Sequence, residues 1–223
     1  MGRRPLRGRA TSDFTPGDIP DRPESPPVVA FDFDGTLTVR DSFTSFLKWR
    51  VGGARYAVGM VRLAGAGFSY ALNRDRGRIK AAATKEFLYG VPREQLEEEA
   101  REFAKQCAQD LMRHDAVATF RWWREREATT VIVTASPDIV VAPFARALGA
   151  SLLIGTELAF DSRNRVTGAF ATPNCRGDEK VKRLKEHFGE NLRLAAAYGD
   201  TAGDKPMLAI AEEQGYRVFK SKP

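Results

Sequence analysis

Residues 28–38 read VVAFDFDGTLT, and this stretch decides the fold. Its apolar first half predicts a buried strand over Val28–Phe33, and Gly35 allows the chain to turn sharply at the end of the strand. Residues i and i+2 of a strand point to the same side, so Asp32 and Asp34 are able to project into one site. Two neighbouring carboxylates repel each other, and the pair therefore needs a cation or a shared proton.

A second apolar stretch, Leu192–Tyr198, ends in the same way, because it runs into GDTAGD at 199–204. Asp200 follows the end of this predicted strand, and Asp204 lies one helical turn further on. Open α/β sheets bind ligands at the carboxyl ends of their strands, so these acids are expected near Asp32 and Asp34. Carboxylate oxygens with room for water are typical ligands of Mg²⁺.

Two further segments indicate an anion site. The predicted strand Thr130–Val133 ends in Thr134, Ala135 and Ser136, whose small side chains leave amides and hydroxyls open at the start of the next helix. Lys180 lies near the start of another predicted helix and supplies positive charge for a phosphate. Each feature alone has an ordinary explanation as a turn former, a helix cap or a surface lysine. The four features together, in this order, favour a phosphate-handling site.

The rest of the chain alternates apolar strands with helices, which predicts an α/β fold with a Rossmann-like parallel sheet covered on both faces. A mainly helical stretch interrupts this alternation and is interpreted as an inserted cap. The predicted domains are a disordered proline-rich tail (1–26), a core (28–42 and 116–223) and the cap (43–115). Further strands are predicted at Leu152–Ala159, Arg165–Phe170 and Tyr216–Phe219, and helices at Asp41–Val51, Lys80–Leu88, Arg93–Leu111, Ala116–Arg126, Pro137–Leu148, Asp178–Phe188 and Lys205–Glu213.

The composition is that of a globular chain of 223 residues, with 43% hydrophobic and 29% charged residues, which excludes fibrous and wholly disordered classes. Two cysteines, Cys107 and Cys175, are too few for a disulfide framework and fit a reducing cytosol. The net charge is +6, and most of the excess lies in residues 48–80, which hold eight basic residues against Asp75 alone. A basic segment of this kind suggests an anionic partner or a solvated helix face.

Residues 51–72 are long and apolar enough to be considered as a membrane span, but Arg55 and Arg62 lie within them. Each arginine costs roughly 2.5–3.5 kcal/mol at the bilayer centre, so a full span is rejected. Two interpretations stay open: a packed helix of the cap, or an amphipathic helix on a membrane surface.

The four segments together resemble the haloacid dehalogenase-like superfamily of phosphotransferases. Its motifs occur in order as DxDGT at 32–36, a strand-end threonine at Thr134, a lysine at Lys180 and GDxxxD at 199–204. Aspartate at Asp34 is typical of the phosphatases, and the pattern is similar to subfamily IB, which contains phosphoserine phosphatase. NCRGDEKVKRL (174–184), YGDTAGDKPML (198–208) and DSFTSFL (41–47) are closer still to its phosphatidylglycerophosphatase type.

The resemblance implies a phosphomonoester hydrolase that depends on Mg²⁺. Asp32 would be the nucleophile and form an aspartyl-phosphate, and Asp34 would protonate the leaving alcohol and then take a proton from water. The metal would be held by Asp32, Asp200 and the backbone carbonyl of Asp34.

The same resemblance implies the groups that bind the phosphate and those that position them. Lys180 and Thr134, with the adjacent Ala135, would bind the non-bridging phosphate oxygens. Thr36 and Asp204 would support this shell, Asp204 by orienting Lys180 or a metal-bound water.

Two classes of substrate stay open for such an enzyme. One is a lipid phosphate such as phosphatidylglycerophosphate, for which the basic apolar insert would contact an anionic membrane. The other is a small soluble monoester such as phosphoserine. Phosphoserine phosphatases usually carry a serine where Gly35 stands and a glutamate soon after, whereas the nearest carboxylate here is Asp41. The expected location is cytoplasmic, with peripheral contact at the inner membrane if the substrate is a lipid.

A third reading, from a different class, is a non-catalytic protein that binds anions or nucleic acid through the basic insert. This reading leaves the acidic residues at the strand ends without a use. No nucleic-acid partner is therefore expected.

Overall fold

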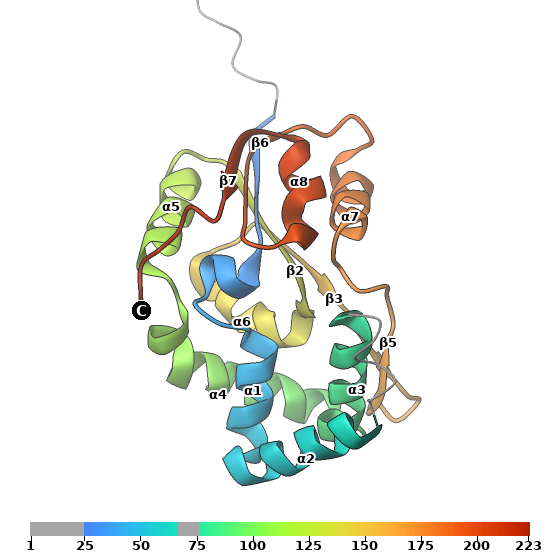
Figure 1. The fold of residues 1–223 in the computed structure, drawn as a ribbon. Coiled ribbons are helices and arrows are strands. Elements are labelled where there is room, and N and C mark those ends of the chain that lie inside the picture. The colour runs from blue at the N-terminus through green and yellow to red at the C-terminus, as the bar shows by residue number, and fades with distance from the viewer. Residues whose placement is uncertain (1–24, 67–75) are drawn as a thin grey trace, which may run out of the picture.

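The computed structural model of the chain describes residues 25–66 and 76–223. A five-stranded parallel sheet with the strand order β3-β2-β1-β6-β7 lies at its centre (Figure 1). This sheet confirms the predicted α/β class. Its strands are β1 (Val28–Phe31), β2 (Thr129–Pro137), β3 (Leu152–Thr156), β6 (Leu194–Gly199) and β7 (Ala211–Tyr216).

Alternating side chains of β1 pack into two separate cores, one on each face of the sheet. Val29 and Phe31 belong to the larger core, while Ala30 belongs to the smaller one. Successive residues of a strand point to opposite faces, so a central strand covered on both faces must be apolar throughout. The covering helices are α5 (His114–Glu125) and α6 (Asp138–Leu148) on the larger core, and α7 (Asp178–Phe188) and α8 (Lys205–Ala209) on the smaller one.

Four helices lie beyond the carboxyl ends of the strands, at the bottom of Figure 1. Their packing continues the larger core, because Phe103 contacts Phe46 at 5.5 Å and Phe144 of α6 at 5.8 Å between ring centroids. The first of them begins where the Asp41 carboxylate accepts a hydrogen bond from the Thr44 amide at 2.7 Å. These helices are α1 (Ser42–Val51), α2 (Gly53–Ala66), α3 (Arg76–Leu88) and α4 (Arg93–Leu111). A hairpin of β4 (Leu158–Phe160) and β5 (Val166–Phe170) packs against α3.

The end of the chain differs from its prediction. The helix predicted over Lys205–Glu213 ends at Ala209, and the strand predicted over Tyr216–Phe219 is instead β7 at Ala211–Tyr216. The sequence of β7 is polar because it is an exposed edge strand, so it lacks the apolar run of a buried strand. Backbone pairing with β6 determines its conformation.

The strand predicted over Leu152–Ala159 is also divided. Its first part is β3 of the main sheet, and its second part is β4 of the hairpin. The division follows from pairing with two different partners, β2 and β5, which local apolarity does not reveal.

Several predictions concern residues that the structure does not describe. The predicted disordered tail over 1–26 lies almost entirely outside the described residues, and so does the end of the 51–72 segment. The boundaries proposed for core and cap stay a prediction. Over residues 25–66 and 76–223, every helix is too short or too polar to cross a bilayer.

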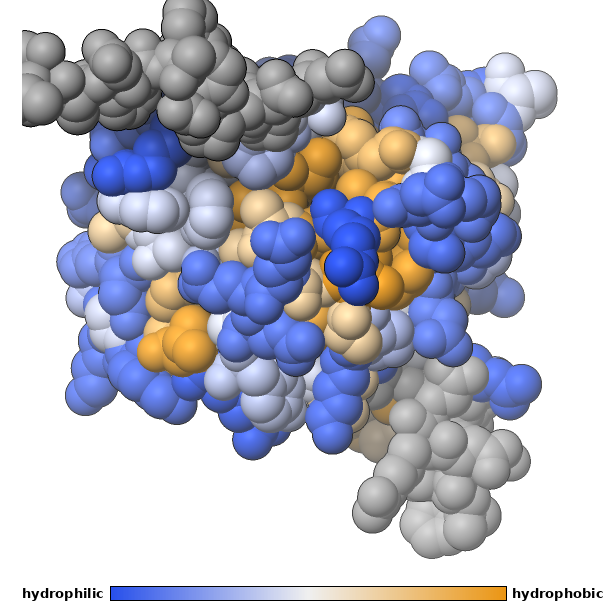
Figure 2. Space-filling view, turned by 90° about the horizontal axis from the view of Figure 1, so that it is seen from above, coloured by the Kyte–Doolittle hydropathy of each residue, from blue (hydrophilic) through white to orange (hydrophobic). Residues whose placement is uncertain are grey.

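The end of the sheet opposite the four helices α1–α4 is seen from above in Figure 2. This face is largely hydrophilic, with apolar residues gathered near its middle. Partly buried hydrophobic residues near the starts of the strands, such as Val28, Leu192 and Ile210, pack against the smaller core. The polar residues of the predicted site follow the strands at their other end.

Candidate active site

Three carboxylates meet where β1 and β6 end. The two strands are parallel neighbours with Phe31 opposite Tyr198, and the Asp32 amide donates to the Tyr198 carbonyl at 2.9 Å. Side-chain oxygens of Asp32, Asp200 and Asp204 therefore lie within 4.8 Å of one another. The structure thus brings together acids that are about 170 positions apart in the sequence.

Lys180 enters this cluster from the first turn of α7 and is 1% exposed. Its ammonium donates to Asp32 Oδ1 at 2.6 Å, to Asp204 Oδ1 at 2.7 Å and to the Val133 carbonyl at 2.7 Å. Burial alone would lower the pKa of Lys180, but the Asp32 and Asp204 carboxylates hold it above its usual value. The lysine is therefore charged, and all three of its protons are committed to these partners.

Asp32 is buried at the centre of the cluster. Its second oxygen accepts a hydrogen bond from the Thr36 hydroxyl at 3.2 Å. Burial raises the pKa of Asp32 to about 7, the Lys180 ammonium opposes this, and the Asp204 carboxylate adds to it. A cation bound beside Asp32 would favour its ionised form.

Asp204 and Asp200 differ in how their oxygens are used. Asp204 accepts from Lys180 with one oxygen and from the amide and hydroxyl of Thr201 with the other, at 2.9 and 2.8 Å. Asp200 Oδ1 is buried and has no hydrogen-bond partner among the described residues. An unpartnered buried carboxylate oxygen beside Asp32 fits a hard cation such as Mg²⁺, whose preferred ligands are oxygens.

Gly35 allows the loop after β1 to approach this acidic cluster. Its φ is +85°, and a Cβ atom at this position would lie 2.4 Å from Asp200 Oδ2. Any other residue would be strained and would also displace the Asp200 carboxylate. The glycine of the DxDGT motif is therefore required by the site as well as by the turn.

Asp34 points away from the cluster, toward the start of α1 and the end of β2. Its carboxylate accepts hydrogen bonds from the Ser42 amide at 2.7 Å and from the Ser136 hydroxyl. Thr134 is fully buried, and its hydroxyl accepts a hydrogen bond from the Ser136 amide at 3.0 Å. A hydroxyl that accepts in this way is still able to donate its own proton.

Lys80 of α3 also reaches the site, and sequence reasoning did not identify it. Its ammonium lies 2.9 Å from the Ser136 hydroxyl, 3.3 Å from Asp41 Oδ2 and 3.8 Å from Asp34 Oδ2. Burial would raise the pKa of Asp41, but Lys80 and the Thr44 amide lower it. The only sequence signal for Lys80 was its membership of the basic segment 48–80.

These residues surround a cavity of about 230 Å³ between the sheet and the four helices α1–α4. Ala135 lines it, and its contact with a phosphate stays a prediction. Two other lining residues, Asn174 and Arg176, precede α7 and were not singled out, although both lie in the NCRGDEK stretch. The cavity thus combines an acidic side at Asp32 and Asp200 with cations from both α3 and α7.

Known proteins resemble this chain over most of its length. The family model described as haloacid dehalogenase-like hydrolase matches residues 29–209. Protein CicA of Caulobacter vibrioides is 57% identical over 198 residues, which cover 89% of each chain.

Solved structures share the fold. A Bordetella pertussis Tohama I protein described as having unknown function superposes with a TM-score of 0.69 at 23% identity, covering 83% of this chain and 86% of its own. A substrate-bound phosphoserine phosphatase superposes with a TM-score of 0.59 at 18% identity, covering 86% of both chains. At these identities the likeness concerns the fold.

Proposed function

The chain belongs to the haloacid dehalogenase-like hydrolase family, and from this premise we propose that it is a phosphomonoester hydrolase that works through an aspartyl-phosphate and depends on Mg²⁺. The observation that carries the proposal is the meeting of Lys180 with Asp32 at 2.6 Å and with Asp204 at 2.7 Å, beside the unpartnered carboxylate oxygen of Asp200. A nucleophilic carboxylate, a fixed cation and a metal-binding acid at one point are what phosphoryl transfer requires.

Asp32 is proposed as the nucleophile. One of its oxygens attacks phosphorus, the bond from phosphorus to the ester oxygen breaks, and Asp34 donates a proton to the departing alcohol. Asp34 then removes a proton from water, which attacks the aspartyl-phosphate and releases inorganic phosphate and free Asp32. The bonds from Ser42 and Ser136 hold the Asp34 carboxylate in place for both steps.

Lys180, Thr134 and Ala135 are proposed to bind the phosphate. Because each proton of Lys180 already has an acceptor, the lysine has to exchange one of these acceptors for a phosphate oxygen. Asp32 is the expected partner to be exchanged, since its oxygen becomes bonded to phosphorus. Asp204 keeps its bond and positions the lysine, and Thr36 positions Asp32.

Asp32, Asp200 and the backbone carbonyl of Asp34 are proposed to hold Mg²⁺. Asp204 is less suited to direct contact, because both of its oxygens already accept hydrogen bonds. When bound, the ion would neutralise the charge between the nucleophilic carboxylate and the anionic phosphate.

A lipid phosphate is the proposed substrate class, with phosphatidylglycerophosphate as the example. The support comes from α2, where Val58, Met60 and Val61 are 49%, 37% and 72% exposed. Arg55 and Arg62 of the same helix share one carboxylate, Glu86, at 2.8 and 3.6 Å, which leaves an excess of positive charge there. Such a face suits peripheral contact with an anionic lipid surface.

The small size of the cavity favours the alternative, a soluble monoester such as phosphoserine. A volume of about 230 Å³ holds a phosphate and a few further atoms, so a lipid would have to keep its acyl chains outside. Lys80 and Asp41 at its edge present both signs of charge, which suits a zwitterionic leaving group.

A phosphate-release assay with both substrates tests the proposal. We expect the protein with Mg²⁺ to release phosphate from phosphatidylglycerophosphate in mixed micelles, from phosphoserine, or from both. Excess EDTA should stop the reaction and added Mg²⁺ should restore it. Absence of release from every ester, or full turnover in excess EDTA, would contradict the proposed activity or its metal.

The substrate class is tested by changing the exposed face of α2. Val61→Asp should lower the rate on phosphatidylglycerophosphate in anionic vesicles while leaving the rate on phosphoserine unchanged. Equal rates of the variant and the natural protein on the vesicles would remove the support for a lipid surface.

A further inference from the structure

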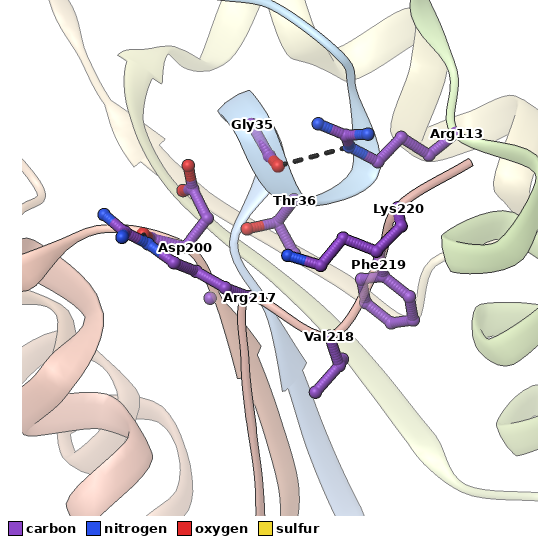
Figure 3. Close-up of a pocket in the computed structure, with 9 residues that line it drawn as sticks. Gly35, Thr36, Arg113, Asp200, Arg217, Val218, Phe219 and Lys220 are labelled. Carbon is purple, nitrogen blue, oxygen red and sulfur yellow. Dashed lines mark hydrogen bonds between the residues drawn. The ribbon is translucent and has the colours of Figure 1, made fainter. Parts of the chain in front are cut away.

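A second cavity, of about 340 Å³, lies beside the active site on the other side of Asp200. The loop after β1 and the end of β6 form one side, and the chain after β7 forms the other (Figure 3). It shares Gly35 and Asp200 with the catalytic cavity but none of Asp32, Asp34, Lys80 and Lys180. It is therefore a separate space beside the proposed metal site.

Three cations from two distant parts of the chain surround this space: Arg113, and the pair Arg217 and Lys220. The Arg113 guanidinium donates to the carbonyls of Gly35 at 3.3 Å and Ser221 at 2.8 Å, and Arg217 donates to the Asp200 carbonyl at 2.7 Å. Figure 3 shows the Lys220 ammonium directed toward the side formed by Thr36 and Asp200.

None of these three cations forms a salt bridge within residues 25–66 and 76–223. The two arginines are fixed by neutral carbonyls, which orient a guanidinium but do not cancel its charge. A concave surface with three positive charges and one carboxylate, Asp200, keeps an excess of positive charge and attracts anions.

Hydrogen bonds and a ring contact hold the segment that carries Arg217 and Lys220. The Asp115 carboxylate accepts hydrogen bonds from the amides of Lys220 and Ser221, at 2.7 and 2.9 Å, and from the Ser221 hydroxyl at 2.7 Å. Phe219 packs on Tyr198 with 5.3 Å between ring centroids. The backbone around Lys220 is thus held at the cavity by contacts that do not involve the Lys220 ammonium.

Arg217 adopts a backbone conformation that is unfavourable for its type, with φ at +55°. Residues with a Cβ atom rarely adopt this left-handed region, because the Cβ atom crowds the neighbouring carbonyl. The conformation brings the Arg217 guanidinium back to Asp200, where its Nε contacts the carbonyl.

We propose that this cavity is a second anion site, which binds a phosphoryl dianion through Arg113, Arg217 and Lys220. The dianion is either free inorganic phosphate or the phosphate group of a small monoester. The site stands on these contacts and does not require the proposed hydrolase activity. Its position against Asp200 and Gly35 means that an occupant changes the surroundings of the proposed metal ligand.

Amide hydrogen exchange followed by mass spectrometry tests the site, because the Lys220 and Ser221 amides report on this segment directly. In the full-length protein with EDTA, phosphate at ten times its Kd should slow exchange over 216–223 by about tenfold. KCl at the same ionic strength should not. Lys220→Gln should weaken phosphate binding about 10- to 100-fold, the usual loss for a charge-assisted hydrogen bond. Lys222→Gln, an equal charge change two residues away, should behave as the natural protein.

The outcomes separate this site from the catalytic one. Protection of residues 28–37 and 178–188 without protection of 216–223 means that phosphate binds only in the catalytic cavity, and overturns the proposal. Equal protection by KCl, or loss of protection in Lys222→Gln as well, also overturns it. If phosphate protects residues 216–223 in a protein that hydrolyses no ester, the result supports this site and contradicts the proposed function.

The source of the dianion is determined in the Asp32→Asn background, where an added monoester should not be turned over. Stronger protection of 216–223 by glycerol phosphate than by inorganic phosphate identifies a monoester as the ligand. Equal or weaker protection identifies the free ion. Both outcomes support the site.

Discussion

Asp32→Asn should stabilise the metal-free protein increasingly as the pH rises, while it removes activity. The carboxyl of Asp32 has its pKa raised from 3.8 to about 7, with burial as the largest cause. A raised folded pKa means that the folded state holds a proton that the unfolded state releases between pH 4 and 7. Stability is therefore lost as the pH rises through this range.

The magnitude follows from the size of the shift. The pKa of Asp32 rises by about three, and each step of one corresponds to about 1.4 kcal/mol. The free energy of unfolding of the natural protein is therefore lower by roughly 4 kcal/mol above pH 7. Less than half of this loss has occurred by pH 5. The difference in the free energy of unfolding between the variant and the natural protein should therefore grow by about 3 kcal/mol from pH 5 to pH 8. Asparagine does not ionise, and the variant lacks this decline. Any constant effect of the lost contact with Lys180 cancels in this comparison.

Urea unfolding in EDTA at pH 5, 6, 7 and 8 measures the difference, with Asp110→Asn as the control. Asp110 is an exposed acid of α4, and its replacement corrects for the general effect of removing one negative charge. Mg²⁺ should stabilise the natural protein and have a much smaller effect on Asp32→Asn. Turnover in Asp32→Asn should fall by at least about 10³-fold, because the nucleophile is absent. A difference that stays constant or shrinks with pH would show that the ion pair with Lys180 outweighs the burial of Asp32, and would refute the reasoning.

Two other substitutions test the packing of the site. Lys180→Met leaves Asp32 and Asp204 buried without their cation, and should lower the free energy of unfolding by about 3–5 kcal/mol at neutral pH. Lys182→Met on the exposed side of α7 is its control; equal losses in urea unfolding would argue against the buried pairs. Gly35→Ala places a Cβ atom 2.4 Å from Asp200 Oδ2, and should weaken Mg²⁺ binding at least about tenfold by calorimetry. Gly177→Ala has a similar φ of +63° but open space, so a matching loss of Mg²⁺ affinity there would assign the effect to backbone strain alone.

The edge strand β7 shows where prediction from local pattern failed. Its residues, AEEQGY, are polar and favour a helix, and they form a strand because the β6 backbone pairs with them. Strands buried on both faces, such as β1, were recognisable because their surroundings require apolar residues at every position.

Lys80 and the chain end at Arg217–Lys220 were missed for a related reason. Lys80 is one of eight basic residues in its segment, and only the packing of α3 above the sheet selects it. Arg217 and Lys220 lie at the second cavity because Asp115, about 105 positions earlier, binds the following backbone. Neither position has a local pattern that distinguishes it.

The sequence by itself determined the parallel α/β class, the strand that carries Asp32 and Asp34, and the order of the phosphate-handling segments, because burial and turn formation act between residues a few positions apart. The tertiary structure decided which groups meet. The Lys180 ammonium contacts Asp32 across 148 positions, Asp34 faces Ser136 and Lys80, and three cations gather beside Asp200. Such contacts depend on how whole helices and strands pack, and packing between distant segments is set by their combined shapes and not by any one stretch of residues.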